Sequence, residues 1–226
     1  MKNPVEDILP LSPLQQGLLV HSAIDEQDAA VYNSQFFADL AGRLDPAALR
    51  AAVEGLLRRH PNLRAGFRYQ GLDQPVQVIR RHARSPWRSM DLTGLPASEA
   101  AAALDRVMAE ERTTPFDLAR PPLLRVVLIR LAADLHRLVL TNHHILLDGW
   151  SMPLVLEDLF ALYEAGGDGS GLAAVPPHRA YLEWLAVQDR PAAEAAWRES
   201  LAGLDQPTLL ASPSPSGAPL PSHLQQ

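Results

Sequence analysis

The segment best suited to chemistry is the run 142–151, which reads Asn-His-His-Ile-Leu-Leu-Asp-Gly-Trp-Ser. It follows an apolar stretch with strand character and precedes a stretch with helical spacing, and strand ends commonly carry the active groups of open sheets. Adjacent side chains of a strand point to opposite faces, so His143 and His144 cannot easily share one task. We expect one imidazole to face the core and the other to face a cleft.

Asp148, Gly149 and Ser151 follow the histidines at short spacing. Because Asp148 comes directly after Ile-Leu-Leu, its carboxylate is expected in an apolar neighbourhood, where it needs a cationic or hydrogen-bonding partner. Gly149 predicts a tight turn or a close approach of the backbone to a ligand. Ser151 is placed to act as the N-cap of the next helix.

Three interpretations of these residues remain open on residue types alone. Two imidazoles and a carboxylate could bind a metal, but the opposed faces of adjacent histidines and the absence of cysteine argue against a metal site. A serine nucleophile is disfavoured because Gly149-Trp-Ser-Met-Pro153 is not a glycine-flanked elbow. The plainest interpretation is a hydrogen-bonded polar core at a strand end.

Hydrophobic periodicity around this segment predicts an α/β fold, a two-layer sandwich in which a mixed sheet is covered by helices. The hairpin ending at Asn142 is the strand pair that would carry the histidines. The expected elements, in chain order, are a strand region within Val31–Leu44, a helix from Asp45-Pro46 to about Arg59, strands Leu63–Tyr69 and Val76–Ile79, a helix Ser98–Arg112 capped by Ser98, strands Leu123–Leu131 and Leu135–Asn142, and helices Ser151–Tyr163 and His178–Leu201.

Composition narrows the class of protein. The 226 residues are 47% hydrophobic and 20% charged, enough for one globular domain, and the absence of cysteine excludes disulfides and thiolate chemistry. No apolar run approaches the roughly 20 residues of a membrane span, and the first residues do not resemble a signal peptide, so a soluble, cytoplasmic protein is expected. Residues 1–205 form the predicted domain, and 206–226, rich in proline and serine, a flexible tail.

Charge is distributed unevenly along the chain. The net charge is −6, yet residues 43–90 contain ten arginines and three acidic residues, a local balance of 10 − 3 = +7. Such a segment attracts acidic partners or phosphate groups. The negative net charge of the whole chain, and the lack of aromatic residues interspersed among the basic ones, argue against nucleic-acid binding.

Several motifs, in order, resemble the condensation domains of nonribosomal peptide synthetases. The run His143–Gly149 fits their His-His-x-x-x-Asp-Gly signature, which related acyltransferases share more loosely. The other matching stretches are Leu11–His21 (LSPLQQGLLVH), Arg59–Phe67 (RHPNLRAGF), Pro115-Phe-Asp117 followed by Pro121–Arg125 (PPLLR), and Tyr181–Trp184 (YLEW).

The resemblance implies a chloramphenicol-acetyltransferase-like lobe that joins an acyl or peptidyl thioester to the amine of an aminoacyl thioester, each carried on the phosphopantetheine of a carrier protein. His144 matches the histidine that acts on the attacking amine. His143 and Asp148 match structural residues, and Arg64 matches the arginine that pairs with the aspartate. Gly149 would let the substrate approach, and Ser151 and Trp150 lie next to the bound substrate, although Trp150 also suits a packing role. The family implies no bound cofactor and no metal.

The resemblance covers only the N-terminal lobe of a family whose members have two similar lobes. The missing partner is expected to be a separately encoded C-terminal lobe or a further copy of this chain. Two alternatives stay open: a stand-alone, coenzyme A-dependent acyltransferase whose site forms between subunits, and a non-catalytic fragment that binds a carrier protein. The first motif and the histidine motif favour the subtype that accepts a D-configured donor. Arginines of the basic segment, Arg58 and Arg59 among them, are candidates for docking an acidic carrier.

Overall fold

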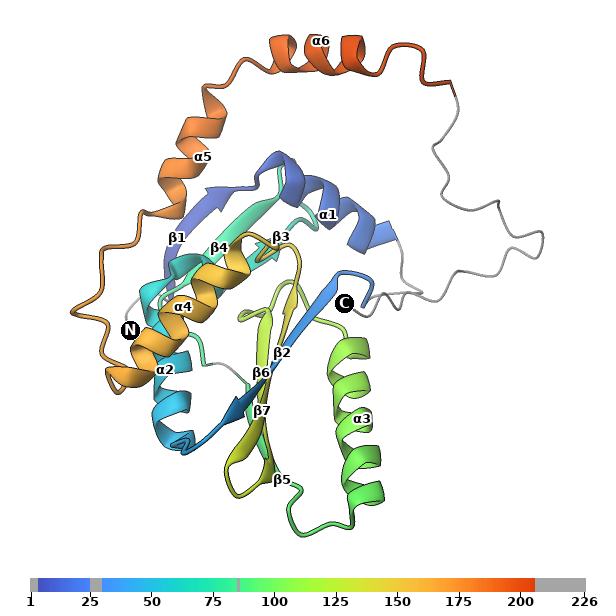
Figure 1. The fold of residues 1–226 in the computed structure, drawn as a ribbon. Helices are drawn as coiled ribbons and strands as arrows, with labels where there is room; N and C mark the ends of the chain where they lie inside the picture. Colours follow the sequence, from blue (N-terminus) through green and yellow to red (C-terminus); the bar gives the residue numbers. More distant parts are fainter. Residues whose placement is uncertain (1–3, 25–29, 85, 206–226) are drawn as a thin grey trace. The chain divides into compact units, whose positions relative to one another are not determined.

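A four-stranded sheet, in the order β2-β7-β6-β5, carries the histidine segment at the end of one of its strands (Figure 1). In the computed structural model, which describes residues 4–24, 30–84 and 86–205, β6 (Leu124–Ala132) and β7 (Leu135–His143) form the predicted antiparallel hairpin. β2 (Asn33–Ala41) pairs antiparallel with β7, and β5 (Trp87–Asp91) pairs parallel with β6. The sequence did not predict β5, whose five residues alternate only weakly.

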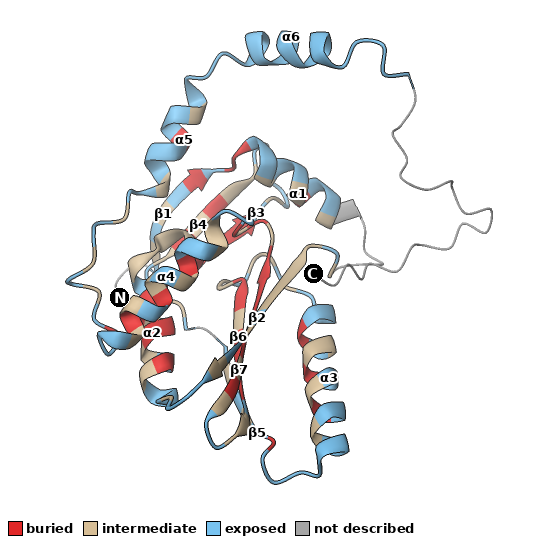
Figure 2. Cartoon of the chain, viewed as in Figure 1, coloured by how far each residue is buried: buried red, intermediate tan, exposed pale blue. Residues whose placement is uncertain are grey.

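Side chains alternate between two apolar cores along the central hairpin. Leu128 and Leu138 lie in one core with residues of α2 (Pro46–Arg59) and α4 (Ser151–Glu164), whereas Val127 and Val139 lie in another with residues of α3 (Ala97–Thr113). Full burial of each such side chain stabilises the folded state by about 1.5–3 kcal/mol of free energy. The predicted α/β class, with a mixed sheet covered by helices, is confirmed, and the sheet has helices on both faces (Figure 2).

A second sheet has three antiparallel strands in the order β1-β4-β3. They are β1 (Val5–Pro10), β3 (Ala65–Arg68) and β4 (Val76–Arg80). Its core joins Phe67 and Ile79 to Leu19 of α1 (Pro13–Ile24) and Leu182 of α5 (His178–Ala186). Ile145, two residues after His143, is buried in the same core, so the histidine segment connects the packing of both sheets.

Local chemistry explains the helix ends. The α2 helix starts as predicted, with the Asp45 carboxylate accepting from the backbone N–H groups of Ala47 and Ala48 and with proline at the first helical position. The predicted Ser98 cap is wrong, because α3 begins one residue earlier, after Pro96, without a side-chain cap. Pro61–Arg64 forms a short 3-10 helix, η2, between α2 and β3.

The single helix expected over His178–Leu201 is wrong. The structure has two helices, α5 and α6 (Arg190–Ser200), separated where Asp189 caps a new helix that has a proline in its first turn. The break coincides with the division of the chain into two compact units, residues 1–186 and 187–226. The proposed tail 206–226 lies outside the described residues. No helix within the described ranges is long and apolar enough to cross a membrane.

Candidate active site

The two histidines lie at the end of β7 in different environments. His143 is the last residue of the strand and is buried, and its backbone N–H donates to Leu123 O (3.1 Å). His144 is half-buried, and its backbone N–H donates to Tyr32 O (2.8 Å) just before β2. The prediction that only one of the two imidazoles lies in the core is confirmed.

The His143 ring is held neutral by its surroundings. Its Nδ1 accepts the backbone N–H of Ile145 (3.1 Å), and the ring packs against Tyr32 and Phe116 at centroid distances of 6.0 and 6.5 Å. Burial, followed by the charge of neighbouring His144, lowers the pKa of His143 to about 4. At neutral pH the proton is therefore on Nε2, which lies 3.5 Å from Ser22 Oγ.

The His144 ring has one tautomer set by a single contact. Its Nδ1 lies 2.9 Å from Leu147 O, and a carbonyl oxygen can only accept a hydrogen bond. Nδ1 therefore carries the proton. In the neutral ring, Nε2 has a free lone pair and can accept a proton or a hydrogen bond.

Asp148 stabilises the turn after the histidines. Its Oδ1 accepts from the backbone N–H (2.8 Å) and the hydroxyl (2.6 Å) of Ser151, and these bonds, the hydroxyl foremost, lower the pKa of Asp148. The expected apolar neighbourhood is wrong: Ile145 and Leu147 are buried, but the turn then directs Asp148 to the surface. The predicted Ser151 N-cap is also wrong, because Ser151 is the first helical residue of α4 and Asp148 accepts from it.

Arg64 does not pair with Asp148, so that prediction is wrong. The guanidinium is buried, with Nε donating to Leu57 O (2.8 Å) and one terminal nitrogen donating to Glu6 Oε2 (2.7 Å) and to the carbonyls of Arg80 and Arg81. Arg64 is the last residue of η2, and these partners come from β1, from β4 and the residue after it, and from the end of α2 rather than from the histidine turn. It ties α2 to the three-stranded sheet.

Gly149 and Trp150 are exposed parts of the same turn. A Cβ at Gly149 would meet nothing within 4 Å, and its φ is not positive, so no contact within the chain requires glycine there. Trp150 is 89% exposed, so it has no packing role within the described chain, and packing against a further lobe stays a prediction. Contact of Gly149, Trp150 and Ser151 with substrate stays a prediction.

A groove of about 320 Å³ lies next to this turn. Its lining includes Leu147 and Ser151 at the turn, Leu154 of α4, Tyr181 of α5, and His60, which follows α2. Within the described ranges, no three His, Asp or Glu side chains gather as a metal site requires. His144 is not among the lining residues of the groove, which meets the turn through Leu147 and Ser151. The arrangement suits acid–base or hydrogen-bonding chemistry at His144 Nε2.

Three residues around His143 were missed from the sequence as site residues. Ser22 and Tyr32 reach His143 from more than 100 positions away in the chain, and no local pattern marks them. Phe116 belongs to the Pro-Phe-Asp motif, and that motif was the available signal.

Comparison with known proteins identifies the family. The family described as "Condensation domain" matches residues 5–220. The chain belongs to the condensation-domain family. One of the linear gramicidin synthase proteins of Brevibacillus parabrevis is 37% identical to this condensation-domain chain over 206 residues, which cover 90% of the chain and 4% of the synthase protein. Bacitracin synthase 1 of Bacillus licheniformis is 36% identical over 203 residues, covering 89% and 4%. The resemblance to nonribosomal peptide synthetases is confirmed.

Solved condensation domains share the fold of this chain. A doubly substituted variant of the starter condensation domain of the rhizomide synthetase RzmA has a TM-score of 0.79 at 26% identity, covering 92% of this chain and 48% of the solved one. The first condensation domain of the CDA synthetase has a TM-score of 0.72 at 25% identity, covering 89% and 52%. The chain thus spans about half of each solved condensation domain and 4% of the two synthases.

Proposed function

We propose that this chain supplies the histidine-bearing half of a site that forms peptide bonds in nonribosomal synthesis. The amine of a carrier-bound aminoacyl thioester attacks the carbonyl of an upstream carrier-bound acyl or peptidyl thioester. A C–N bond forms, the C–S bond breaks, the amine loses a proton and the departing thiolate gains one. The observation that carries the proposal is the Nδ1–H of His144 donating to Leu147 O, which leaves Nε2 free for the amine.

His144 has two roles compatible with this geometry. An α-amine has a reference pKa of about 7.7–8.0, so part of it is neutral before any catalyst acts. The amine nitrogen becomes strongly acidic only as the C–N bond forms, and Nε2 can then accept its proton. The same lone pair can instead orient the amine by accepting a hydrogen bond from it.

A solved relative supports the substrate class. A variant of the RzmA domain, 25% identical to this chain with a TM-score of 0.79, was determined in complex with C8-CoA and Leu-SNAC. The first of these is a coenzyme A conjugate and the second is a leucine derivative. For this chain, we propose thioesters of the same two kinds, presented by carrier proteins.

The other half of the site is proposed to cover the exposed apolar surface around the histidine turn. Leu154 is 64% exposed and Tyr181 of α5 is 49% exposed, and both line the groove of about 320 Å³. Trp150, directly before Ser151 of the lining, is 89% exposed. Exposed apolar groups gathered in this way are typical of interaction surfaces. A C-terminal lobe, or a second copy of the chain, would cover them and close the site.

Carrier docking is proposed at a basic cleft rather than at Arg58 and Arg59. Arg58 donates to Gly167 O (3.1 Å), and Arg59 donates to Asp158 (2.7 Å), so both are occupied within the fold. A cleft of about 490 Å³ is lined instead by the basic side chains of Arg68, Arg80, His82 and Arg120, of which Arg120 pairs with Asp117 (3.1 Å) outside the lining. Its charge suits an acidic carrier surface or the phosphate of its phosphopantetheine.

The test of the function uses the chain together with a C-terminal lobe and two loaded carrier proteins. Amide formation is expected, and His144→Ala should lower its rate by about 10²–10⁴-fold while leaving the unfolding midpoint unchanged. An unchanged rate in the variant would remove His144 from the chemistry. Acyl transfer from coenzyme A by a trimer of the chain alone would favour the stand-alone acyltransferase, and carrier binding without any product would favour the non-catalytic fragment.

The test of the docking surface reverses charge in the cleft. Arg68→Glu with Arg80→Glu should weaken binding of the loaded carrier by about tenfold or more, with a smaller salt dependence than in the parent. The matched control is Arg43→Glu with Arg106→Glu, which makes the same charge change at exposed arginines outside the cleft. Equal weakening by both pairs would show a general effect of net charge and refute the cleft.

A further inference from the structure

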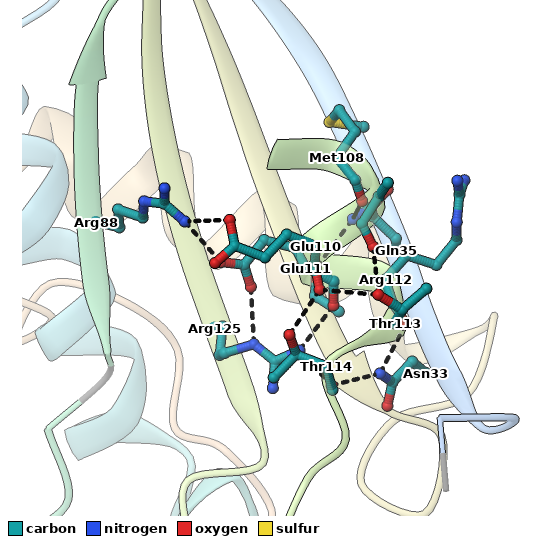
Figure 3. A network of polar contacts seen from close by, with 12 residues as sticks. Asn33, Gln35, Arg88, Met108, Glu110, Glu111, Arg112, Thr113, Thr114 and Arg125 are labelled. Carbon is teal, nitrogen blue, oxygen red and sulfur yellow. Dashed lines mark hydrogen bonds and ion pairs between the residues drawn. The ribbon is translucent and has the colours of Figure 1, made fainter. Parts of the chain in front are cut away.

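The C-terminal end of α3 is attached to the four-stranded sheet by polar side chains of the neighbouring strands, among them Asn33 of β2 and Arg125 of β6 (Figure 3). The last carbonyls of a helix have no partner within it. Asn33 Nδ2 donates to Arg112 O (2.9 Å) and Thr114 O (2.8 Å), and Arg125 donates to Glu111 O (2.7 Å) and Thr114 O (2.9 Å). Side chains of two strands therefore bond the carbonyls at the end of this helix.

Arg125 also forms an ion pair between the helix and the sheet. Its Nε donates to Glu111 Oε2 at 2.8 Å, and the side chains are only 15% and 10% exposed. The planar guanidinium uses separate nitrogens for the carboxylate and the two carbonyls, a geometry that the single ammonium of lysine cannot reproduce. Arg125 is thus held in one orientation.

Phe116 connects this ion pair to the buried histidine. The Arg125 guanidinium carbon lies 3.9 Å from the centroid of the Phe116 ring, and that ring meets the His143 ring edge to face, at 6.5 Å and 88°. A cation over an aromatic face and an edge-to-face aromatic contact are both favourable and directional. The ring of Phe116 therefore contacts both the Arg125 guanidinium and the His143 ring.

His143 in turn shapes the turn that orients His144. Two hydrogen bonds to His143 hold the turn closed. The Ile145 N–H donates to His143 Nδ1, and the Leu146 N–H donates to His143 O (3.0 Å). This turn places Leu147 O against His144 Nδ1. A displaced His143 ring would loosen the contact that leaves His144 Nε2 free.

We propose that Arg125 is a positioning residue for the histidine pair, acting through Phe116 and His143 to hold His144 in its working orientation. The inference rests on the proposed function of His144. It assigns a role to the Pro-Phe-Asp and Pro-Pro-Leu-Leu-Arg motifs, which the proposed chemistry leaves unused. Arg125 itself does not touch the reacting atoms.

The chain contains its own control for this proposal. Arg137 lies over the ring of Phe37 with its guanidinium carbon 4.8 Å from the centroid, and it pairs with Asp39 at 2.7 and 2.8 Å. The ring contacts found among the described residues pair His143 with Tyr32 and Phe116, and Phe37 is not among them. Substitutions at Phe37 thus change the same kind of contact away from the histidines.

The experiment follows the histidine rings of the full chain by proton–nitrogen NMR across a pH titration. In the parent, His143 should stay neutral with the proton on Nε2, and its pKa should be about 4. In Phe116→Leu the ring of His143 becomes better hydrated, so its pKa should rise by about one unit or more toward 6.5, and the Nδ1–H signal of His144 should lose its hydrogen-bonded shift. Phe116→Tyr keeps the ring and should restore both signals.

Arg125→Lys separates positioning from charge. The lysine keeps the positive charge but lacks the planar guanidinium with its several N–H donors. The variant should therefore produce the same changes in the His143 and His144 signals to a smaller degree. Phe37→Leu should leave both rings unchanged. The proposal is overturned if Phe116→Leu and Arg125→Lys lower the unfolding midpoint but leave the histidine pKa and tautomers as in the parent. If Phe116→Leu does not fold, Arg125→Lys and Phe116→Tyr decide the question.

A kinetic measurement distinguishes failure of this proposal from failure of the proposed function. In the two-lobe assay, Phe116→Leu should lower kcat by about 10- to 100-fold with little change in KM, because a misplaced group loses rate rather than binding. An unchanged kcat with altered ring signals would overturn the positioning role. No product from the parent would overturn the function, and the ring titration would still decide whether Arg125 orients the histidines.

Discussion

Two groups of similar residues lie on one sheet and are built differently. The Arg125 cluster consists of Arg125, Glu111 and Phe116, and the Arg137 cluster of Arg137, Asp39 and Phe37. In the Arg125 cluster the strand, the helix and the following loop each supply one residue, and the ion pair is 15% and 10% exposed. In the Arg137 cluster neighbouring strands supply all three, and the pair is 21% and 45% exposed.

The difference shows that burial and the origin of the partners decide what such a group does. Asp39 lies directly opposite Arg137 in the pairing of β2 with β7, so backbone hydrogen bonds of the sheet already hold the two residues side by side. Their ion pair therefore adds no new link between separate elements. A pair that joins a helix to a sheet fixes the position of one layer on the other. Removing one partner of a buried pair leaves an uncompensated charge, whereas an exposed charge returns to water.

The largest expected difference comes from truncating the two arginines. Arg125→Ala should lower the free energy of unfolding by about 3–5 kcal/mol, since the buried carboxylate and the backbone carbonyl of Glu111 lose this donor, while Thr114 O keeps Asn33. Arg137→Ala should lower it by about 1 kcal/mol or less. Urea denaturation of both variants measures this difference. Equal losses would mean that burial does not separate the clusters.

The pH dependence of stability should differ between the two regions. The pKa of His143, which contacts the Arg125 cluster, is about 4 in the folded chain against 6.5 unfolded, so the unfolded chain binds more protons between these values. The free energy of unfolding should therefore fall as the pH drops from 6.5 to 4, by about 3 kcal/mol at about 1.4 kcal/mol per unit. His143→Gln should remove that part of the slope, whereas His178→Gln should remove only the separate contribution of His178, whose pKa burial also lowers.

The Arg137 cluster should respond in a lower pH range. Hydrogen bonding by Arg137 lowers the pKa of Asp39 below 3.8, so the stability it contributes is present above 3.8 and is lost as the pH falls through the folded pKa. Asp39→Asn should leave the slope between pH 6.5 and 4 unchanged. A change in that range would contradict the assignment to His143.

Arg64 and Asp148 offer a second pair of buried and exposed charges whose truncations can be compared. Asp148→Ala removes two bonds at an exposed turn and should cost about 1 kcal/mol, similar to a lost helix cap. Arg64→Ala leaves Glu6 and the carbonyls of Leu57, Arg80 and Arg81 without this buried donor and should cost clearly more. Chemical denaturation of each variant tests the order. A cost for Asp148→Ala as large as that for Arg64→Ala would indicate a buried pairing of the aspartate after all.

Salt should produce the smallest effect. Raising ionic strength from 0.1 to 1 M shortens the screening length from about 10 to 3 Å, mainly at exposed charges. The coupling energy of Arg137 with Asp39, measured by a double-mutant cycle, should then fall from about 0.5 kcal/mol toward zero. The coupling of Arg125 with Glu111 should change by a smaller fraction. A larger fractional loss in the Arg125 cluster would reverse the comparison.

The elements with strong local signals were predictable from the sequence. The hairpin of β6 and β7 follows from two apolar runs around a short turn, and the start of α2 follows from Asp45-Pro46. The strand β5 was missed because it is short and weakly patterned, and the long C-terminal helix was predicted across a break that Asp189 creates. The candidate His144 also came from its motif.

The partners of charged side chains were not predictable in the same way. The pairing of Arg64 with Asp148 was wrong because several acceptors compete for one guanidinium, and the fold brings Glu6 and three carbonyls to it first. Burial of Asp148 was wrong because one turn reverses the direction of the chain after Leu147. Both outcomes depend on how separate elements meet.

By itself, the sequence determined the α/β class, the main helices and strands around the histidines, and the family to which they belong. These properties rest on the periodicity and order of residues along the chain. Only the tertiary structure decided which imidazole is buried, which nitrogen of His144 is free, and that Arg125 reaches Phe116 and Glu111. The physical reason is that hydrogen bonds and burial depend on distances between segments far apart in the chain, which no local pattern specifies.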